Sequence, residues 1–357
     1  MNATKSTQST APAGHDGLAC VPLADQPVPR GDYVSDAQVR WCPGCGDYSI
    51  LATFLGLLPK LGLKRENTVV VSGIGCSSRF PYYVDTYGIH SIHGRAPAIA
   101  TGLATVRPDL NVWVITGDGD ALSIGGNHLI HALRRNVNLT IILFNNRIYG
   151  LTKGQYSPTS PAGTITKSSP KGSLDLPFDP VSLALGAEAS FVARALDTDR
   201  AGLTEAMERA ARHRGAALIE VMQNCVIFAD GTWDSARGPE TESSIVRLAD
   251  GEPVTWAGGT KCLVRDPATG ELTPAVTADA APEQIVVHRE SASDPSLAFG
   301  LSRLDRLGLT PVGVFRAVDR PAYDDEARAQ VTWIEDRAKR AKVMQKLLVG
   351  PDSWTID

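Results

Sequence analysis

Short apolar runs that alternate with helix-like segments are the feature that most restricts the fold of this chain. The runs hold consecutive β-branched and other apolar residues, without the polar alternation of a half-exposed strand. Parallel sheets that are covered on both faces contain strands of this kind. The strand-like runs are 68–72, 112–116 and 139–144, the helix-like segments are 47–60 and 123–135, and a further αβ pattern covers 178–223. The alternation predicts an α/β fold, in which helices flank a parallel sheet.

The two ends of the chain differ from this middle part. Residues 1–30 are rich in Ser, Thr, Ala, Gly and Pro, which is typical of a flexible tail. The α/β domain is expected to cover 31–235. Beyond it, 236–357 contains turn clusters such as DGEP and DPATGE, which indicate loops and hairpins, and 324–349 has the spacing of an amphipathic helix. We therefore expect a tail, one α/β domain and a C-terminal hairpin and helix extension.

The composition excludes several classes of function. The chain has 35 Lys and Arg against 39 Asp and Glu, and this balance gives no basic surface for nucleic acid or an anionic membrane. No apolar run reaches the roughly 18 residues that a membrane span needs, and the N-terminus lacks the apolar stretch of a secretion signal. A cytoplasmic protein is expected. Six cysteines are too few for a disulfide scaffold, and the closely spaced Cys42 and Cys45 suggest a metal site or redox chemistry.

A Gly-Asp-Gly sequence and an Asn pair follow two of the predicted strands. Gly117, Asp118 and Gly119 come directly after one strand, and Asn145 and Asn146 come directly after the next. Open α/β sheets bind ligands at the carboxyl ends of their strands, so both motifs are expected on one rim. The Asp118 carboxylate and the Asn146 amide oxygen suit Mg²⁺, and the glycines allow a diphosphate to approach the backbone. The alternative is that these residues only cap helices and turns.

Four of the six cysteines lie at the ends of predicted elements, where they can converge. They are Cys42, Cys45, Cys76 and Cys225. Four thiolates suit either a [4Fe–4S] cluster or a structural zinc ion. A zinc module usually takes a second closely spaced pair, so the isolated third and fourth cysteines favour the cluster. Cys20 and Cys262 are interpreted as ordinary thiols.

Five segments carry a resemblance to a known family. They are WCPGCGD over 41–47, GIGCS over 73–77, HGR over 93–95, the GDG…NN unit and GLTKGQ over 150–155. The GDG…NN unit resembles the thiamine diphosphate motif, and together the segments resemble the thiamine-binding β subunits of 2-oxoacid:ferredoxin oxidoreductases. The resemblance covers residues about 30 to 235 and is strongest to the 2-oxoglutarate branch. It implies the diphosphate-type thiamine-binding fold and oxidative decarboxylation of 2-oxoglutarate with CoA to succinyl-CoA and CO₂, with pyruvate or another 2-oxoacid as the alternative substrate.

The same resemblance implies a role for individual residues. It places the [4Fe–4S] cluster on Cys42, Cys45, Cys76 and Cys225, and Mg²⁺ on the side chains of Asp118 and Asn146 and the carbonyl of Ile148. The residues that would line thiamine diphosphate are Ile74, Gly75, Cys76, Ser77, His93, Gly94, Gly119, Asp120, Gly150 and Leu151. Arg79 and Lys153 match positions that face the substrate carboxylates. Exposed surface charge is the alternative for these two residues, and a structural role is the alternative for His93.

A chain with one α/β domain lacks the second domain that thiamine enzymes need. That domain holds the aminopyrimidine ring and supplies its glutamate, so no catalytic residue is assigned to this chain. We expect a larger α subunit, or a fused γ/α subunit, in an (αβ)₂ assembly, with ferredoxin as the electron acceptor. Two other interpretations stay open: a non-oxidative thiamine enzyme subunit with structural zinc, and a non-catalytic zinc-stabilised protein. A non-oxidative subunit would contain zinc and no iron, unlike the oxidoreductase. A non-catalytic protein would not bind thiamine diphosphate.

Overall fold

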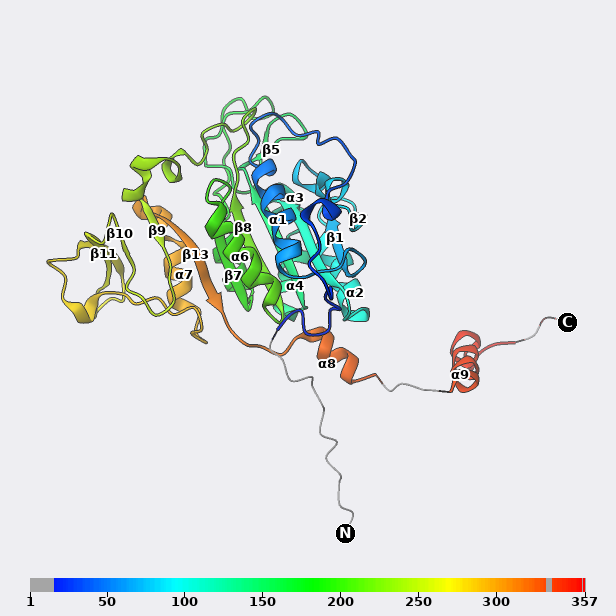
Figure 1. The fold of residues 1–357 in the computed structure, drawn as a ribbon. Coiled ribbons are helices and arrows are strands. Elements are labelled where there is room, and N and C mark those ends of the chain that lie inside the picture. The colour runs from blue at the N-terminus through cyan, green and yellow to red at the C-terminus, as the bar shows by residue number, and fades with distance from the viewer. Residues whose placement is uncertain (1–15, 332–335, 355, 357) are drawn as a thin grey trace, which may run out of the picture.

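The computed structural model describes residues 16–331, 336–354 and 356, and its centre is an eight-stranded sheet (Figure 1). The strand order is β2-β1-β3-β4-β8-β7-β13-β9. Their bounds are β1 Thr68–Ser72, β2 Tyr87–His90, β3 Asn111–Gly117, β4 Leu139–Asn145, β7 Phe191–Leu196, β8 Ala216–Met222, β9 Ile245–Arg247 and β13 Thr310–Ala317. Every neighbouring pair is parallel except β13 and β7, which are antiparallel. The predicted α/β class is confirmed.

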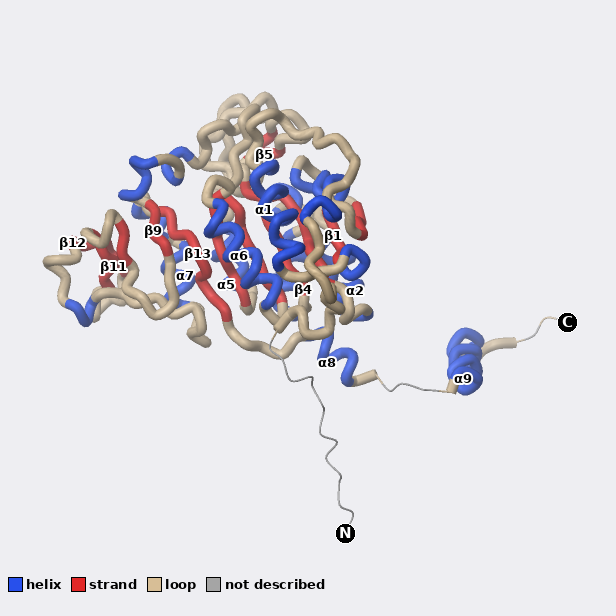
Figure 2. The backbone as a smooth tube through the Cα atoms, viewed as in Figure 1, coloured by secondary structure: helices blue, strands red, loops and turns tan. Residues whose placement is uncertain are grey.

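Helices cover both faces of this sheet (Figure 2). Their bounds are α1 Asp47–Lys60, α2 Ala96–Val106, α3 Asp118–Leu122, α4 Gly126–Arg135, α5 Pro180–Gly186, α6 Arg200–Arg212, α7 Ser296–Ser302, α8 Tyr323–Ala329 and α9 Arg337–Val349. Apolar residues of α2, α4, α5 and α7 form one buried cluster with the sheet, and those of α1 and α6 form another. The strands are apolar throughout because they lie between these two layers: all residues of β1, β4 and β8 are buried. The expected helix over 123–135 is shorter, since a turn separates α3 from α4.

Part of the C-terminal segment belongs to the main sheet. The short antiparallel sheet of β10 Thr255–Trp256, β11 Lys261–Arg265 and β12 Leu272–Val276 matches the hairpins expected there. The strands β9 and β13, however, extend the central sheet beyond β7. Two further hairpin strands, β5 Ile148–Tyr149 and β6 Gln155–Tyr156, lie above the carboxyl ends of the main strands. The segment after 236 therefore forms a separate hairpin unit, β10 to β12, and also supplies the edge strands β9 and β13 of the central sheet.

The segment over 324–349 contains two helices instead of one. The Ile334 position of the expected amphipathic helix lies outside the described residues, between α8 and α9. In Figure 1, α9 lies apart from the rest of the chain. Its apolar side chains, Leu347 among them, are exposed. The spacing of apolar residues thus predicted the helices here, whereas the described part of α9 shows no buried face.

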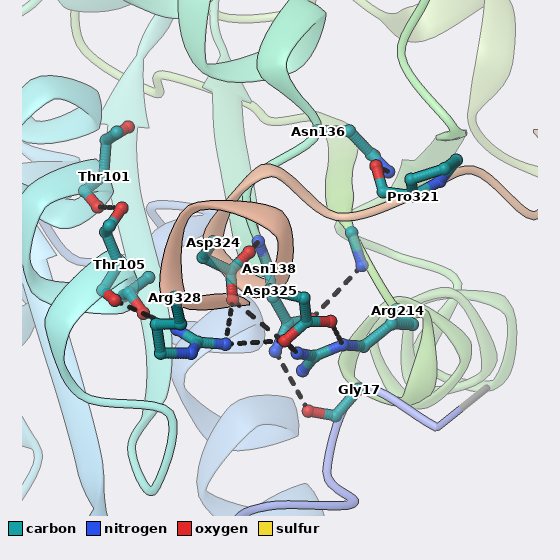
Figure 3. Close-up of polar contacts among 12 residues, drawn as sticks. Gly17, Thr101, Thr105, Asn136, Asn138, Arg214, Pro321, Asp324, Asp325 and Arg328 are labelled. Carbon is teal, nitrogen blue, oxygen red and sulfur yellow. Dashed lines mark hydrogen bonds and ion pairs between the residues drawn. The ribbon is translucent and has the colours of Figure 1, made fainter. Parts of the chain in front are cut away.

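An ion-pair cluster holds α8 against the amino-terminal end of the sheet (Figure 3). Arg328 Nη2 lies 2.9 Å from Asp324 Oδ2 and 2.6 Å from Asp325 Oδ1, and Arg214 Nε lies 2.9 Å from Asp325 Oδ2. Arg328 Nη1 also donates to the last carbonyls of α2, those of Ala104 and Thr105. These contacts satisfy carbonyls that a helix end leaves without a partner in its own helix.

The N-terminal segment is packed from residue 16 onward. Residues 1–15 of the expected flexible tail lie outside the described residues. Leu18 and Val21 are buried, and the Gly17 backbone N–H donates to the backbone carbonyl of Arg212 at the end of α6. These contacts attach residues 16–21 to the domain, where the composition predicted a flexible tail. Of the helices that the structure describes, none has both the length and the apolar character needed to cross a bilayer.

Candidate functional site

The Gly-Asp-Gly motif forms the junction between β3 and α3, so that Asp118 begins a helix at the rim of the sheet. Its side chain is buried, and burial raises the pKa of Asp118 to about 6, although hydrogen bonds from Ser157 and Thr159 act in the opposite direction. The Oδ2 atom of Asp118 lies 2.5 Å from the Ser157 hydroxyl and 2.6 Å from the Thr159 hydroxyl. The Gly119 backbone N–H also hydrogen-bonds to this carboxylate, so the orientation of Asp118 at the rim is fixed.

The Asn pair ends β4 and reaches the same rim. The Asn146 amide oxygen accepts from the Ile148 backbone N–H at 3.2 Å, and Arg147 between them has a φ of 58°. This left-handed residue reverses the chain and brings Ile148 back to the rim. A cavity of about 80 Å³ is bordered by Asp118, Asn146 and Ile148 together. One carboxylate, one amide oxygen and one carbonyl are the oxygen ligands that Mg²⁺ accepts.

This rim cavity contains most of the residues predicted to line a cofactor. It is lined by Ile74, Gly75, Cys76, Ser77, His93, Gly117, Asp118, Gly119, Asp120, Phe144, Asn146, Ile148, Tyr149, Gly150, Leu151 and Thr152. Of the ten predicted lining residues, Gly94 alone is missing from this set. Its backbone N–H instead donates to Asp120 Oδ1 at 2.8 Å. Four segments that are far apart in sequence, 74–77, 93, 117–120 and 144–152, thus meet at one hollow.

Asp120 connects the loops around the cavity. Its Oδ1 atom accepts from the Ile74 and Gly94 backbone N–H groups and lies 2.5 Å from His93 Nδ1. Its Oδ2 atom accepts from the Thr116 hydroxyl at 2.7 Å. A side chain at Gly73 would place its Cβ 1.8 Å from Asp120 Oδ2, so this approach requires glycine. Asp120 therefore holds the 73–77 loop and the 93–95 loop in place.

The four cysteines of the predicted cluster line a second cavity, of about 220 Å³. Cys42 is exposed, and Cys45, Cys76 and Cys225 are half-buried. Burial raises the pKa of Cys76 to about 12, and that of Cys45 further still, with the Asp47 carboxylate adding to both effects. Thiolates in such a place need a positive partner, which iron provides.

The thiols surround this hollow rather than meeting at one point. A Cβ at Gly150 would lie 3.6 Å from the sulfurs of both Cys76 and Cys225, so glycine leaves the middle open. Within the described ranges, no three His, Cys, Asp or Glu side chains are arranged to hold a single metal ion. In a [4Fe–4S] cluster four cysteines are placed around the whole cluster. The donor set and the open hollow fit that group.

The two cavities adjoin. Cys76, Asn146, Gly150 and Leu151 border both of them. A group bound at the rim would therefore lie beside residues that also line the thiol cavity, Cys76 among them.

Arg79 and Lys153 lie at the thiol cavity and not among the residues that line the rim cavity. Arg79 Nη1 donates to the Arg40 carbonyl at 3.2 Å, and Lys153 is exposed with a φ of 71°. Both basic side chains therefore lie beside the four cysteines, in the cavity that adjoins the rim cavity.

Sequence reasoning missed the residues that hold Asp118. Ser157 and Thr159 belong to the run Ser-Pro-Thr-Ser, which follows β6 and folds back over the rim. The missed residues also include Tyr149, whose hydroxyl donates to the Gly119 carbonyl at 2.9 Å. A run of hydroxyl side chains directly after GLTKGQ was the available signal, since hydroxyl groups often satisfy buried carboxylates.

Comparison with known proteins identifies the class of this domain. Residues 73–221 match the family described as thiamine pyrophosphate enzyme, C-terminal TPP binding domain. This stretch contains the Gly-Asp-Gly motif and the Asn pair on their two strands. The domain is therefore a thiamine diphosphate-binding domain.

Individual relatives narrow the class of this chain further. The chain is 60% identical over 343 residues to the 2-oxoglutarate oxidoreductase subunit KorB of Mycobacterium tuberculosis, covering 95% of this chain and 91% of the relative. It is 48% identical over 185 residues to the 2-oxoglutarate synthase subunit KorB of Archaeoglobus fulgidus, covering 52% of this chain and 69% of that one. A solved structure of the 2-oxoglutarate:ferredoxin oxidoreductase from Magnetococcus marinus is similar with a TM-score of 0.69 and 31% identity, over 93% of this chain and 96% of the other. The chain belongs to the family of β subunits of 2-oxoacid:ferredoxin oxidoreductases.

Proposed function

We propose that this chain is the β subunit of a 2-oxoglutarate:ferredoxin oxidoreductase. The reaction converts 2-oxoglutarate, CoA and two oxidised ferredoxins into succinyl-CoA, CO₂, a proton and two reduced ferredoxins. The observation that carries the proposal is the wall shared by the rim cavity and the cavity of the four cysteines, which Cys76 and Gly150 both border. A decarboxylation site and a one-electron acceptor need this proximity. The names of the relatives, which are 2-oxoglutarate enzymes, support 2-oxoglutarate as the substrate.

The residues of this chain divide between two groups to be bound. Asp118, Asn146 and the Ile148 carbonyl would hold Mg²⁺ on the diphosphate of thiamine diphosphate. The four cysteines would hold the [4Fe–4S] cluster. When bound, thiamine diphosphate stabilises the negative charge left by departing CO₂, and the cluster accepts the released electrons singly.

Two basic residues of the thiol cavity would orient the substrate. Arg79 and Lys153 border the thiol cavity, which adjoins the rim cavity through shared residues. Paired with the distal carboxylate of 2-oxoglutarate, they would favour a dicarboxylate over pyruvate. The rest of the site would come from a larger α subunit, or a fused γ/α subunit, in an (αβ)₂ assembly. That subunit would supply the aminopyrimidine side with its glutamate, and ferredoxin would take the electrons.

Metal analysis of the complex tests this proposal. The chain is co-expressed with its large partner subunit and purified without oxygen, and iron, sulfide and zinc are measured per chain. The proposal predicts about four irons and four sulfides for each cluster site. One zinc ion and no iron would contradict it and assign the chain to the non-oxidative thiamine enzymes.

A further inference from the structure

Asp118 begins a chain of buried polar contacts that leads away from both cavities. The Thr159 hydroxyl lies 2.6 Å from Asp118 Oδ2 and 2.9 Å from the Asn145 amide oxygen. Asn145 Nδ2 in turn donates to Glu220 Oε1 at 2.6 Å. All four side chains are buried. A continuous path therefore joins the rim of the sheet to Glu220 on β8.

An ion-pair triad fixes the far end of this path. Arg194 Nε donates to Glu220 Oε2 at 2.6 Å, and Arg194 Nη2 donates to Asp179 Oδ2 at 2.6 Å. The exposed fractions of the three side chains are 6% for Arg194, 1% for Glu220 and 11% for Asp179. Asp179 also accepts from the Ser182 backbone N–H at the start of α5. The guanidinium carbon of Arg194 lies 5.6 Å from the centre of the Phe315 ring, which belongs to β13.

Stability of the fold does not account for such an arrangement. Burying three charges has a desolvation cost that apolar residues of the same volume avoid. Filling the interior does not account for it either, because Asp179, Arg194, Glu220, Asn145 and Thr159 all border a cavity of about 390 Å³. The arrangement does fix the orientation of these side chains, since each polar group limits how the next one can turn.

The direction of each contact follows from hydrogen-bond chemistry. Glu220 is held by Arg194 and offers only acceptors, so the NH₂ group of Asn145 must face it. The Asn145 oxygen is then turned toward Thr159. Thr159 has a single hydroxyl hydrogen, which is shared between the Asn145 amide oxygen at 2.9 Å and the closer Asp118 Oδ2 at 2.6 Å, and Ser157 donates to the same Asp118 oxygen. The contacts together thus hold the Asp118 carboxylate in one orientation at the rim, where the metal would bind.

We propose that Thr159, Asn145 and Glu220 are positioning residues for the Mg²⁺ ion of the thiamine diphosphate site. Arg194 and Asp179 fix Glu220 in the required orientation. This inference rests on the proposed function, because it needs the metal and the diphosphate at the rim. It gives the first Asn of the pair a role different from that of the second, which borders the rim cavity itself. Outer partners of this kind usually contribute 10- to 100-fold to metal affinity.

The test measures Mg²⁺ binding to the complex of this chain with its large partner subunit, by titration calorimetry at saturating thiamine diphosphate. Thr159→Val removes the hydroxyl and keeps the shape, so Mg²⁺ affinity should fall by about 10- to 100-fold. Thr159→Ser retains the hydroxyl and should restore binding to within about threefold of the wild type. Glu220→Gln should also weaken binding, because Asn145 Nδ2 and Arg194 Nε donate to different oxygens of Glu220, and the glutamine places an NH₂ donor against one of them.

Thr140→Val is the matched control. Thr140 is buried on β4 like Asn145, and its hydroxyl makes only a 3.4 Å contact to the Ala210 carbonyl. Melting temperatures of the metal-free complexes show how much each substitution lowers the stability of the folded protein, independently of metal binding. The inference requires that Thr159→Val weaken Mg²⁺ binding well beyond Thr140→Val at a comparable melting temperature.

Three results would overturn the inference, and they differ in what else they overturn. Equal Mg²⁺ affinity in Thr159→Val, Thr140→Val and the wild type would remove the positioning role and leave the proposed function standing. Equal weakening by Thr159→Val and Thr159→Ser would do the same, since the hydroxyl would then not matter. A wild-type complex that binds neither Mg²⁺ nor thiamine diphosphate would overturn the proposed function and this inference together.

Discussion

Single residues at the rim combine predictable and unpredictable features. Asp118 and Asn146 follow strands in the sequence, and parallel strands end on one side of a sheet, so their meeting was foreseeable. Ser157 and Thr159 reach Asp118 through an irregular loop of about 20 residues between β6 and α5, whose path no periodicity encodes. The cysteines were predicted only in part. Their positions at the ends of elements predicted that they converge, whereas the hollow between them depends on Gly150.

The cluster assignment gives a prediction for individual thiols. Cys225→Ser should reduce the iron content of the anaerobically purified complex by most of its value, because the cluster loses one of four ligands. Cys20→Ser is the control, since Cys20 is a half-buried thiol that does not border the cysteine cavity. Iron analysis of both variants measures the difference. Full iron content in Cys225→Ser would show that Cys225 is not a ligand.

Lys153 supplies the test of substrate choice. Lys153→Ala should raise the KM for 2-oxoglutarate by about tenfold or more, because a charge-assisted hydrogen bond is lost, and should change the KM for pyruvate much less. Lys171→Ala, at an exposed lysine away from both cavities, should change neither value. Steady-state kinetics of the complex decide the matter. Equal effects of Lys153→Ala on both substrates would contradict carboxylate pairing.

His213 predicts a pH dependence of folding. Burial lowers the pKa of His213 to about 4, and its Nε2 atom lies 2.6 Å from the Ser190 hydroxyl. Between about pH 6.5 and pH 4 the unfolded chain takes up a proton at this residue and the folded chain does not. The free energy of unfolding should therefore fall across this window as pH falls, by up to about 3 kcal/mol. Nearby Asp319 opposes the shift and limits its size.

Urea unfolding of the wild type and of His213→Gln at several pH values measures this contribution. The difference in unfolding free energy between the two proteins should change between pH 6.5 and pH 4 and stay constant above pH 7. A difference that is the same at every pH would show that His213 titrates normally in the folded chain.

At the scale of elements, the alternation of strands and helices predicted the central layers and missed the edge. The runs in β1, β3 and β4 are apolar because helices cover both of their faces. β13 was not foreseen because it comes after the turn-rich hairpin unit and pairs with β7, more than 100 residues earlier in the chain. Pairing at that separation is a tertiary effect, which local spacing does not encode.

The anchoring of α8 gives a prediction at this scale. Arg328→Gln removes the ion pairs to Asp324 and Asp325 and the contacts to the last carbonyls of α2. The free energy of unfolding should fall by about 1–3 kcal/mol, since partly buried hydrogen bonds to a charged group are lost. Arg340→Gln on the exposed helix α9 is the control and should have almost no effect. Denaturant titration distinguishes the two, and equal losses would mean that the cluster does not anchor α8.

At the scale of the whole molecule, the site is arranged as half of an active centre. The rim cavity lies at the carboxyl ends of β3 and β4 and adjoins the thiol cavity through shared residues. Within the described residues there is one central sheet, with no second α/β unit to hold the other end of the cofactor. The account therefore places the complete reaction in the complex and assigns the cluster and the metal-diphosphate contacts to this chain.

The visible spectrum of the anaerobic complex during reaction tests this central claim most directly. Adding 2-oxoglutarate and CoA without ferredoxin should bleach the broad iron–sulfur absorption, because electrons from the substrate collect on the cluster, and adding oxidised ferredoxin should restore it. The Cys225→Ser complex should show no such change. A wild-type complex that contains the cluster and turns over 2-oxoglutarate without any bleaching would contradict the account, since the electrons would then not pass through the cysteines beside the rim cavity.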